Sequence, residues 1–308
     1  MNSRAFLGVI IVLMVFSFGC AGTSTKDKNP FIGGTNGILI NFIESAPPAE
    51  VFDGGEFPFD TIIRLTNDGE YTVPKEKVWL WLIGIDPAEF GLPSGALFKQ
   101  PVEELIKVGR DSSGNKIPST PTEIIFNGFN YYGHLTGDVS YNIIASLCYN
   151  YETTANAKIC VKSNLLDSSE TVCKLNEKKT VYSSGAPIQV TSFTESVSGK
   201  DKINFEFTIE QKGNGVVFKK DVICADKFAN RNKVLVTVNT GMPGAISCTG
   251  LDSGSFGTVV LYTGKRTIGC TQTVDTANQN SYEKQVSINL AYDYMDMKTF
   301  PILVRKSG

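Results

Sequence analysis

A pattern of alternating apolar and polar residues, repeated in the two halves of the chain, is the feature that most limits its fold. Residues 203–210 read INFEFTIE, with every second side chain apolar, and residues 57–65 read FPFDTIIRL, with Phe57, Phe59, Ile63 and Leu65 on one face. A period of two is typical of half-buried antiparallel strands. Both runs lead into a turn rich in Asn and Gly, at 67–69 and 213–215. The same offset of 146 positions (205 − 59 and 215 − 69) separates the two runs and the two turns.

A second match near the end of each half extends the repeat. Residues 147–151 (LCYNY) align with 290–294 (LAYDY) at an offset of 143, and a short apolar run follows each of them. An early strand, a turn, a late strand and a return strand therefore recur in the same order. With almost no helical periodicity, this predicts an all-β chain with two antiparallel β-sandwich domains in tandem, at 31–182 and 186–308.

The first half is longer than the second, and the extra length lies around 84–137. This segment is rich in Pro and Gly, so we expect a long loop inserted into the first sandwich, of the kind that often carries binding. Four aromatic residues close it, and they form either a patch for a protein or glycan partner or a cover over the edge of the sandwich: Phe126, Phe129, Tyr131 and Tyr132. Just before the insertion, VWLWL at 78–82 predicts a buried strand with both Trp on one face, packed inside the protein.

The first thirty residues predict export. Arg4 precedes 15 uncharged and mostly apolar residues, 5–19, which as a helix rise roughly 22 Å, short of a hydrocarbon core of about 30 Å. The run ends in FSFGC, which resembles a lipobox, so residues 1–20 are expected to be a signal peptide with Cys20 as the lipid attachment point. Residues 21–30 then form a flexible tether. Secretion without lipid and an uncleaved anchor helix are the alternatives, and all three place the body outside the cytoplasm.

Six cysteines remain beyond Cys20, and an even number in an exported chain favours disulfides. Three fall in each half, so full oxidation requires at least one bridge between the halves. Cys160 and Cys173 flank an expected hairpin and are the favoured pair, while the sequence leaves the other pairings open. No CxxC spacing and no His cluster indicates a metal site. The six are Cys148, Cys160, Cys173, Cys224, Cys248 and Cys270.

The repeated plan resembles the Ig-like, adhesion-related repeat proteins of archaeal and bacterial cell surfaces, the CARDB-like class. The resemblance covers 31–182 and 186–308 and is carried by FPFDTIIRLTNDGEY, INFEFTIEQKGNG, LCYNYETTANAKICV and LAYDYMDMKTFPILV. It implies an extracellular, non-catalytic module. The first half departs from the class by its length.

The charged residues favour no catalytic or nucleic-acid function. The chain has 29 basic and 31 acidic residues without a basic block, so no nucleic-acid partner is expected. His134 is the single histidine, no Gly-x-Ser-x-Gly elbow is present, and no glycine loop for a cofactor phosphate appears. We therefore expect a non-catalytic lipoprotein on the extracellular face of the cell membrane, serving adhesion, envelope structure or partner binding, with membrane lipid and a surface protein or glycan as partners.

Two other functions stay open. A secreted hydrolase, or its carbohydrate-binding accessory, would use acidic residues of the insertion such as Asp86 and Glu104. A filament or pilus-like subunit would donate its N-terminal segment as a strand to a neighbouring copy.

Overall fold

The computed structural model describes residues 28–166, 172–225, 227–275 and 280–308, and it is all-β with antiparallel sheets, as predicted. Within these ranges the helical elements are two single 3₁₀ turns, η1 (Lys75–Lys77) and η2 (Phe228–Asn230). The signal peptide expected at 1–20, with Cys20, and most of the tether fall outside the described residues. In the described ranges, no helix has the length and apolar character needed to span a bilayer.

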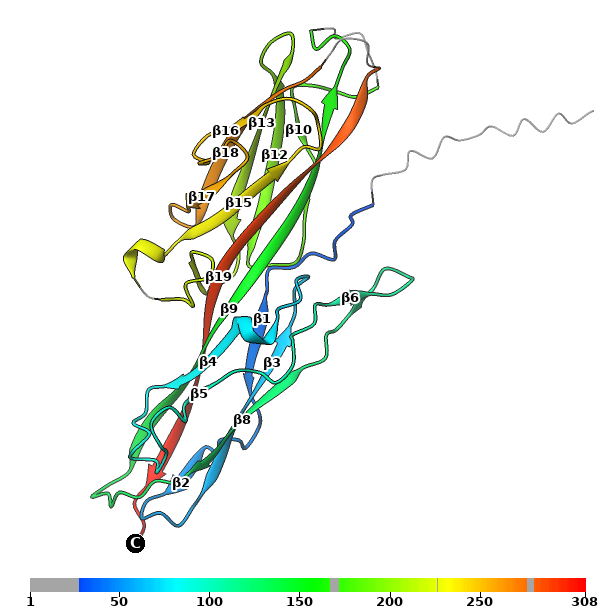
Figure 1. Cartoon of the computed structure of the whole chain (residues 1–308). Helices are drawn as coiled ribbons and strands as arrows, with labels where there is room; N and C mark the ends of the chain where they lie inside the picture. The colour runs from blue at the N-terminus through cyan, green and yellow to red at the C-terminus, as the bar shows by residue number, and fades with distance from the viewer. Residues whose placement is uncertain (1–27, 167–171, 226, 276–279) are drawn as a thin grey trace, which may run out of the picture.

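Two very long strands hold the fold together. β9 (Val139–Val161) and β19 (Tyr282–Arg305) pair antiparallel from Val139–Val304 to Val161–Tyr282, and they run the length of the molecule (Figure 1). They form the centre of a nine-stranded sheet. The strands of its main path follow in the order β17 (Phe256–Val260), β15 (Lys233–Asn239), β19, β9, β4 (Val78–Ile83) and β5 (Phe98–Lys99). Three short strands pair with the central two outside this path. β11 (Val181–Ser183) pairs with β9, and β14 (Val216–Phe218) and β2 (Glu50–Phe52) pair with β19.

Two smaller sheets pack on one face of this long sheet. One has the order β1 (Ile38–Phe42), β3 (Phe59–Asn67), β8 (Thr122–Phe129), and the other β10 (Glu177–Lys179), β12 (Ile188–Val197), β13 (Lys202–Gln211), β18 (Lys265–Thr273), β16 (Ile246–Cys248). Every second residue of β9 from Ile143 to Ile159 is buried beneath them. The β9–β19 ladder therefore lies beneath both smaller sheets.

The alternating runs behave as expected. In β13, Ile203, Phe205, Phe207 and Ile209 are all buried, and in β3 Ile63 and Leu65 are fully buried. Phe57 differs, because β3 begins only at Phe59. Phe57 lies before the strand, is 45% exposed, and packs on Phe52 with ring centroids 4.8 Å apart.

Four buried tyrosines mark the middle of the ladder, where the two halves meet. Tyr149 lies opposite Tyr294, and Tyr151 lies opposite Tyr292. By sequence repeat, however, Tyr149 corresponds to Tyr292 and Tyr151 to Tyr294. The halves are thus related by an approximate two-fold rotation, whose axis passes through the ladder between these pairs.

The tyrosine hydroxyls explain why the repeat contains both a Tyr-x-Tyr motif and a Gly-containing turn. The Tyr294 hydroxyl accepts a hydrogen bond from Gly215 N at 2.7 Å, and the Tyr149 hydroxyl accepts one from Ile38 N at 3.1 Å. A Cβ on Gly69 would lie 2.1 Å from the Tyr151 hydroxyl oxygen, and a Cβ on Gly213 would lie 2.4 Å from that of Tyr294. Each turn needs glycine because a tyrosine hydroxyl fills the space of its side chain.

The segment 84–137, expected as a loop-rich insertion, contains β5, β8 and a small hairpin of β6 (Gly109–Arg110) and β7 (Lys116–Ile117). β8 is an edge strand of the three-stranded sheet and buries Ile124, Phe126 and Phe129. Much of this segment is therefore part of the sandwich itself.

Three disulfides cross-link the described residues: Cys148–Cys224, Cys160–Cys173 and Cys248–Cys270. Cys160–Cys173 is the pair favoured by the expected hairpin, and Cys148–Cys224 is a bridge between the two halves. Cys248 and Cys270 lie opposite each other on β16 and β18. Three bridges suggest an oxidising environment outside the cytoplasm.

Candidate functional site

Strand β4 presents tryptophan on the outside of the nine-stranded sheet. Val78, Leu80 and Leu82 are buried beneath the three-stranded sheet, so the residues between them point the opposite way. Trp79 and Trp81 are only partly buried, and Ile83 is 42% exposed. Both Trp share one face, as expected, and they pack against the cluster of Cys148, Phe218 and Cys224, but they are less buried than expected.

The neighbouring strands continue this face without a single charge. In register across the sheet, Trp79 lies beside Cys148 and Met295, Trp81 beside Ser146 and Met297, and Ile83 beside Ile144 and Thr299. We call the eleven outward side chains of this region the uncharged face. They are Trp79, Trp81 and Ile83 on β4; Phe98 on β5; Asn142, Ile144 and Ser146 on β9; and Met295, Met297, Thr299 and Pro301 on β19.

Large apolar groups on this face are open to solvent. Met297 is 49% exposed and Phe98 is 40% exposed, and Phe98 packs on Trp81 with ring centroids 5.4 Å apart. Single exposed apolar residues are ordinary on protein surfaces, whereas a contiguous uncharged group of them marks an interaction surface.

A loop fixed by Asp293 borders the upper end of the face. The buried Asp293 carboxylate accepts hydrogen bonds from the backbone N–H groups of Asp221 (3.0 Å), Val222 (2.8 Å) and Ile223 (2.7 Å). The Cys148–Cys224 bridge ties the same loop to β9, and Val222 packs with both Trp against that bridge. Ile223, 46% exposed, thereby extends the apolar surface.

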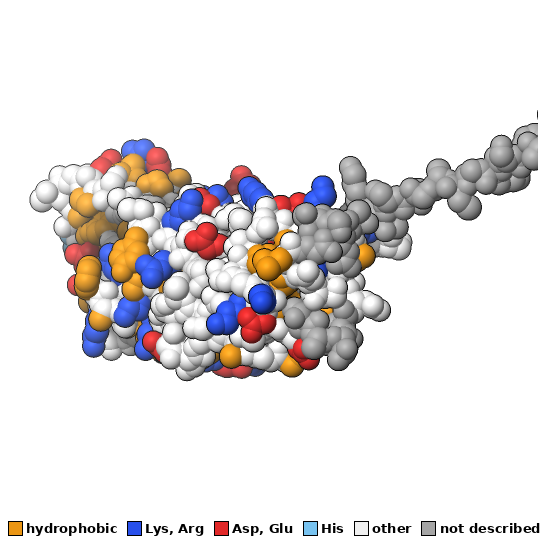
Figure 2. Space-filling model, turned by 90° about the horizontal axis from the view of Figure 1, so that it is seen from above, with side chains coloured by type: hydrophobic (Ala, Val, Ile, Leu, Met, Phe, Trp, Pro, Cys, Tyr) orange, Lys and Arg blue, Asp and Glu red, His pale blue; other side chains and the backbone are white. Residues whose placement is uncertain are grey.

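The same side of the same two strands is polar in the other half of the molecule. There β9 presents Glu152, Thr154, Asn156 and Lys158, and β19 presents Glu283, Gln285, Ser287 and Asn289. Lys158 forms an ion pair with Glu283 at 3.2 Å. Acidic and basic side chains are also interspersed where the molecule is seen from above (Figure 2). The absence of charge is thus specific to the region around β4.

The β4 side of the sheet is closed to strand addition. Leu82 N donates to Leu97 O at 2.8 Å, and Gln100 Nε2 donates to Val78 O at 2.9 Å. These bonds, together with β5, occupy polar groups that an added strand would need. A partner on this side would therefore contact side chains of the face.

Three of the four aromatics considered for a partner patch are part of the core. Phe126 and Phe129 are almost wholly buried and Tyr131 is 6% exposed, so these three take the packing alternative. Tyr132 is 60% exposed, and its ring lies across two glycines, Gly55 and Gly91, whose Cβ atoms would collide with it.

The residues considered for catalysis do not converge. His134 is exposed on a loop, Asp86 Oδ1 accepts a hydrogen bond from Ala88 N at 2.9 Å, and Glu103 and Glu104 are exposed. Among the described residues, no three His, Cys, Asp or Glu side chains form a group suited to a metal ion.

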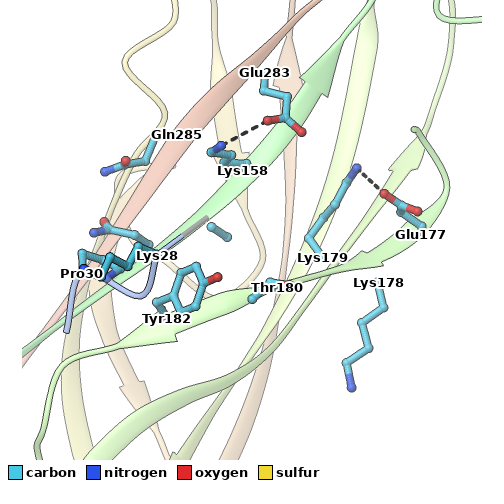
Figure 3. Close-up of a pocket in the computed structure, with 12 residues that line it drawn as sticks. Lys28, Pro30, Lys158, Glu177, Lys178, Lys179, Thr180, Tyr182, Glu283 and Gln285 are labelled. Atoms are coloured by element: carbon cyan, nitrogen blue, oxygen red, sulfur yellow. Dashed lines mark hydrogen bonds and ion pairs between the residues drawn. The ribbon is translucent and has the colours of Figure 1, made fainter. Parts of the chain in front are cut away.

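A cavity of about 360 Å³ lies where the described chain begins (Figure 3). Lys28 and Pro30 lie beside Tyr182 and Gln285 at its rim. Its charged groups include the Lys158–Glu283 pair and the pair of Lys179 with Glu177 at 2.8 Å. The cavity is therefore lined at its rim by the first described residues, and its charged groups are already paired with each other.

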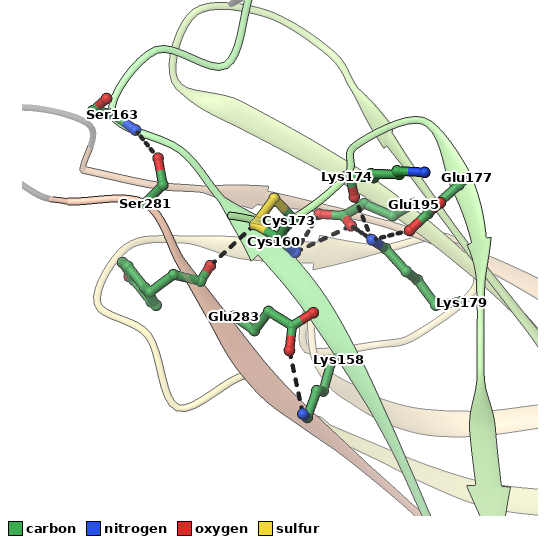
Figure 4. Close-up of a disulfide and its surroundings, with 11 residues drawn as sticks. Lys158, Cys160, Ser163, Cys173, Lys174, Glu177, Lys179, Glu195, Ser281 and Glu283 are labelled. Carbon is green, nitrogen blue, oxygen red and sulfur yellow. Dashed lines mark hydrogen bonds and ion pairs between the residues drawn. A yellow bond between two sulfur atoms is a disulfide. The ribbon is translucent and has the colours of Figure 1, made fainter. Parts of the chain in front are cut away.

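A buried ionic cluster supports the Cys160–Cys173 bridge behind this cavity (Figure 4). The fully buried Glu195 carboxylate accepts a hydrogen bond from Cys160 N at 2.9 Å and lies 3.2 Å from Lys179 Nζ. Lys179 also donates to the backbone carbonyl of Lys174. Burial raises the pKa of Glu195 to about 7, although Lys179 and the Cys160 N–H act to lower it.

No protein-family model and no curated protein matches this chain. The uncharged face was also missed in the sequence, because VWLWLI is apolar at every position and hides which side of the strand is buried.

Proposed function

We propose that this chain is an exported, non-catalytic protein with Ig-like sandwiches, held at the cell surface by lipid on Cys20, which captures a partner through the uncharged face. One observation carries the proposal: eleven neighbouring outward side chains, several of them large and apolar, include no charged residue. The three disulfides support an oxidising location, and the leader sequence supports delivery to it.

The size of the face fits the centre of a protein interface. Four strands about 4.8 Å apart and seven residues at about 3.4 Å each cover roughly 460 Å². Exposed apolar patches of about 300–600 Å² on soluble proteins are often functional, and interface centres are depleted of charge and enriched in Trp and Met.

The place where the described chain begins supports access to this face. The described chain begins toward the right of Figure 1, whereas β4 and β5 lie on the left of the lower half, with β1, β3 and β8 to their right. The first described residues therefore do not cover β4 and β5.

The exposed groups favour a protein partner over a glycan. Sugar rings stack on open aromatic faces, but here both Trp are partly covered by the loop that carries Cys224. The most open side chains are Ile83, Met297 and Ile223 together with Phe98. Such aliphatic groups gain most from contact with other apolar side chains.

Cell-surface cross-linking of the full chain tests this function. Ile83→Lys places a charge in the face, and Ile125→Lys is its matched control, since Ile83 is 42% exposed and Ile125, on the outer side of β8, is 44% exposed. We expect Ile83→Lys to reduce cross-linked partner at least tenfold while Ile125→Lys leaves it unchanged. Equal yields from wild type and Ile83→Lys would refute capture through this face.

A further inference from the structure

We propose that the partner on the uncharged face is a second copy of this chain, so that two copies pack sheet against sheet through β4, β9 and β19. This inference rests on the proposed function and names its partner. It concerns a symmetric contact, in which the same surface of each copy meets itself.

The absence of charge is what a self-contact requires. In a two-fold contact a side chain on the axis meets its own counterpart, so a Lys or Glu there would face a like charge in a dry interface. A face for a different partner is free to carry charges that the partner complements. None of the eleven positions is charged, although the same strands carry Glu152, Lys158 and Glu283 in their other half.

The charged residues at both ends of the face are already paired within the chain. At the lower end, Arg305 binds Glu50 at 2.7 Å, and at the upper end Lys77 binds Asp221 at 2.8 Å. At the lower end Arg305 also lies 3.7 Å from Asp138, so its charge is met by carboxylates of its own chain, and at the upper end Lys77 and Asp221 form a one-to-one pair. Sheets packed face to face lie about 10 Å apart, which leaves these ion pairs at the solvated rim.

Ile144 is the residue best placed to test the contact. It lies on β9, the middle strand of the face, with Ile83 on one side and Thr299 on the other. Because it is central, its counterpart in a symmetric contact lies nearby. If both copies carry the same charged residue at position 144, the two charges repel each other. If one copy carries Lys and the other Glu, the two charges attract.

The experiment uses the full chain in mild detergent and measures its mass by sedimentation equilibrium. We expect wild type to have twice the mass of one chain, and Ile144→Lys and Ile144→Glu each to weaken the dimer at least tenfold. An equimolar mixture of these two variants should restore it. Met297→Glu, at a 49% exposed position, is a second variant in case Ile144 variants fold poorly, and Ile125→Lys is the control that stays dimeric.

The outcomes separate this inference from the proposed function. Wild type that remains a monomer, or a dimer that all face variants retain, overturns the second-copy contact. If wild type is a monomer and Ile83→Lys still loses its cross-linked partner at the cell surface, the face captures a different protein and the proposed function stands. Restoration in the Lys–Glu mixture supports the second copy directly, because a variant that had merely lost its fold would not regain the dimer on mixing.

Discussion

Asn150 Nδ2 donates a hydrogen bond to Asp293 Oδ1 at 2.8 Å, at the point where the two halves of the molecule cross. These residues are equivalent by the internal repeat and also lie opposite each other in the β9–β19 ladder. Only positions on the approximate two-fold axis satisfy both conditions. The repeat has kept a polar residue at this point in each half, and the pair now joins the two sandwiches.

Loss of the Asp293 carboxylate should release the loop that borders the uncharged face. Three backbone N–H groups point at this buried carboxylate, and an amide in its place would offer one oxygen and a clashing NH₂. We expect Asp293→Asn to lower the free energy of unfolding by roughly 2–3 kcal/mol, measured by urea denaturation. Asp296→Asn, a less buried position on the same strand, is the control, and an equal loss there would contradict this account.

The glycine–tyrosine contacts predict which turn residues tolerate a methyl group. Gly69→Ala places a Cβ 2.1 Å from the Tyr151 hydroxyl oxygen, whereas a Cβ on Gly199 meets nothing within 4 Å. We expect Gly69→Ala to cost roughly 1–3 kcal/mol of stability and Gly199→Ala to cost far less. A Cβ on Gly69 would also lie 2.6 Å from Gly185 O and 2.7 Å from Asn36 O, so melting temperatures of the two variants test the packing of the turn as a whole, and similar values would show that it has room for a methyl group.

Much of the fold follows from the sequence, because alternation and turn residues are local signals. Ile203 to Ile209 and the Gly-containing turns fall where the pattern places them. The pairing of β9 with β19 could not be predicted from the sequence. The offset of 143 shows which residues of the two halves are equivalent, but it does not show which residues lie opposite each other in a sheet. The place of Phe126 on a strand also escaped prediction, because Pro and Gly around it indicate a loop while its tertiary contacts make it a strand.

The loss of stability on removing a disulfide should be larger for the bridge that closes the longer segment of chain. Cys148–Cys224 spans 76 positions and Cys160–Cys173 spans 13. The chain-entropy relation gives about 4.5 and about 3 kcal/mol for these lengths. Double alanine variants at each pair, compared by denaturation under the same conditions, should show the larger loss for Cys148–Cys224. The reverse order would mean that native contacts outweigh loop closure.

The buried Glu195 predicts a loss of stability as the pH rises. Its pKa is about 7 in the fold against 4.5 for an ordinary glutamate, so between these values the folded chain binds more protons than the unfolded chain. Stability from this group is therefore complete below pH 4.5 and is lost as the pH rises through 7. The full effect is roughly 3 kcal/mol.

A neutral replacement should remove this pH dependence. Glu195→Gln retains an oxygen for the Cys160 N–H but cannot ionise. We expect its unfolding free energy to change less than that of wild type between pH 5 and pH 7.5. Glu206→Gln, an exposed position on the adjacent strand β13, should follow the wild-type curve. Parallel curves for wild type and Glu195→Gln would show that Glu195 does not titrate in this range.

The shared β9–β19 ladder has a consequence for the order in which the molecule is assembled. Each half of the molecule takes one segment of its central strand pair from β19, so a chain synthesised only as far as Asp275 lacks that segment in both halves. Neither half is then a folding unit that closes while the other is still being made. Synthesis must deliver β19 before the core of either half is sealed, and the two halves mature together in one late step.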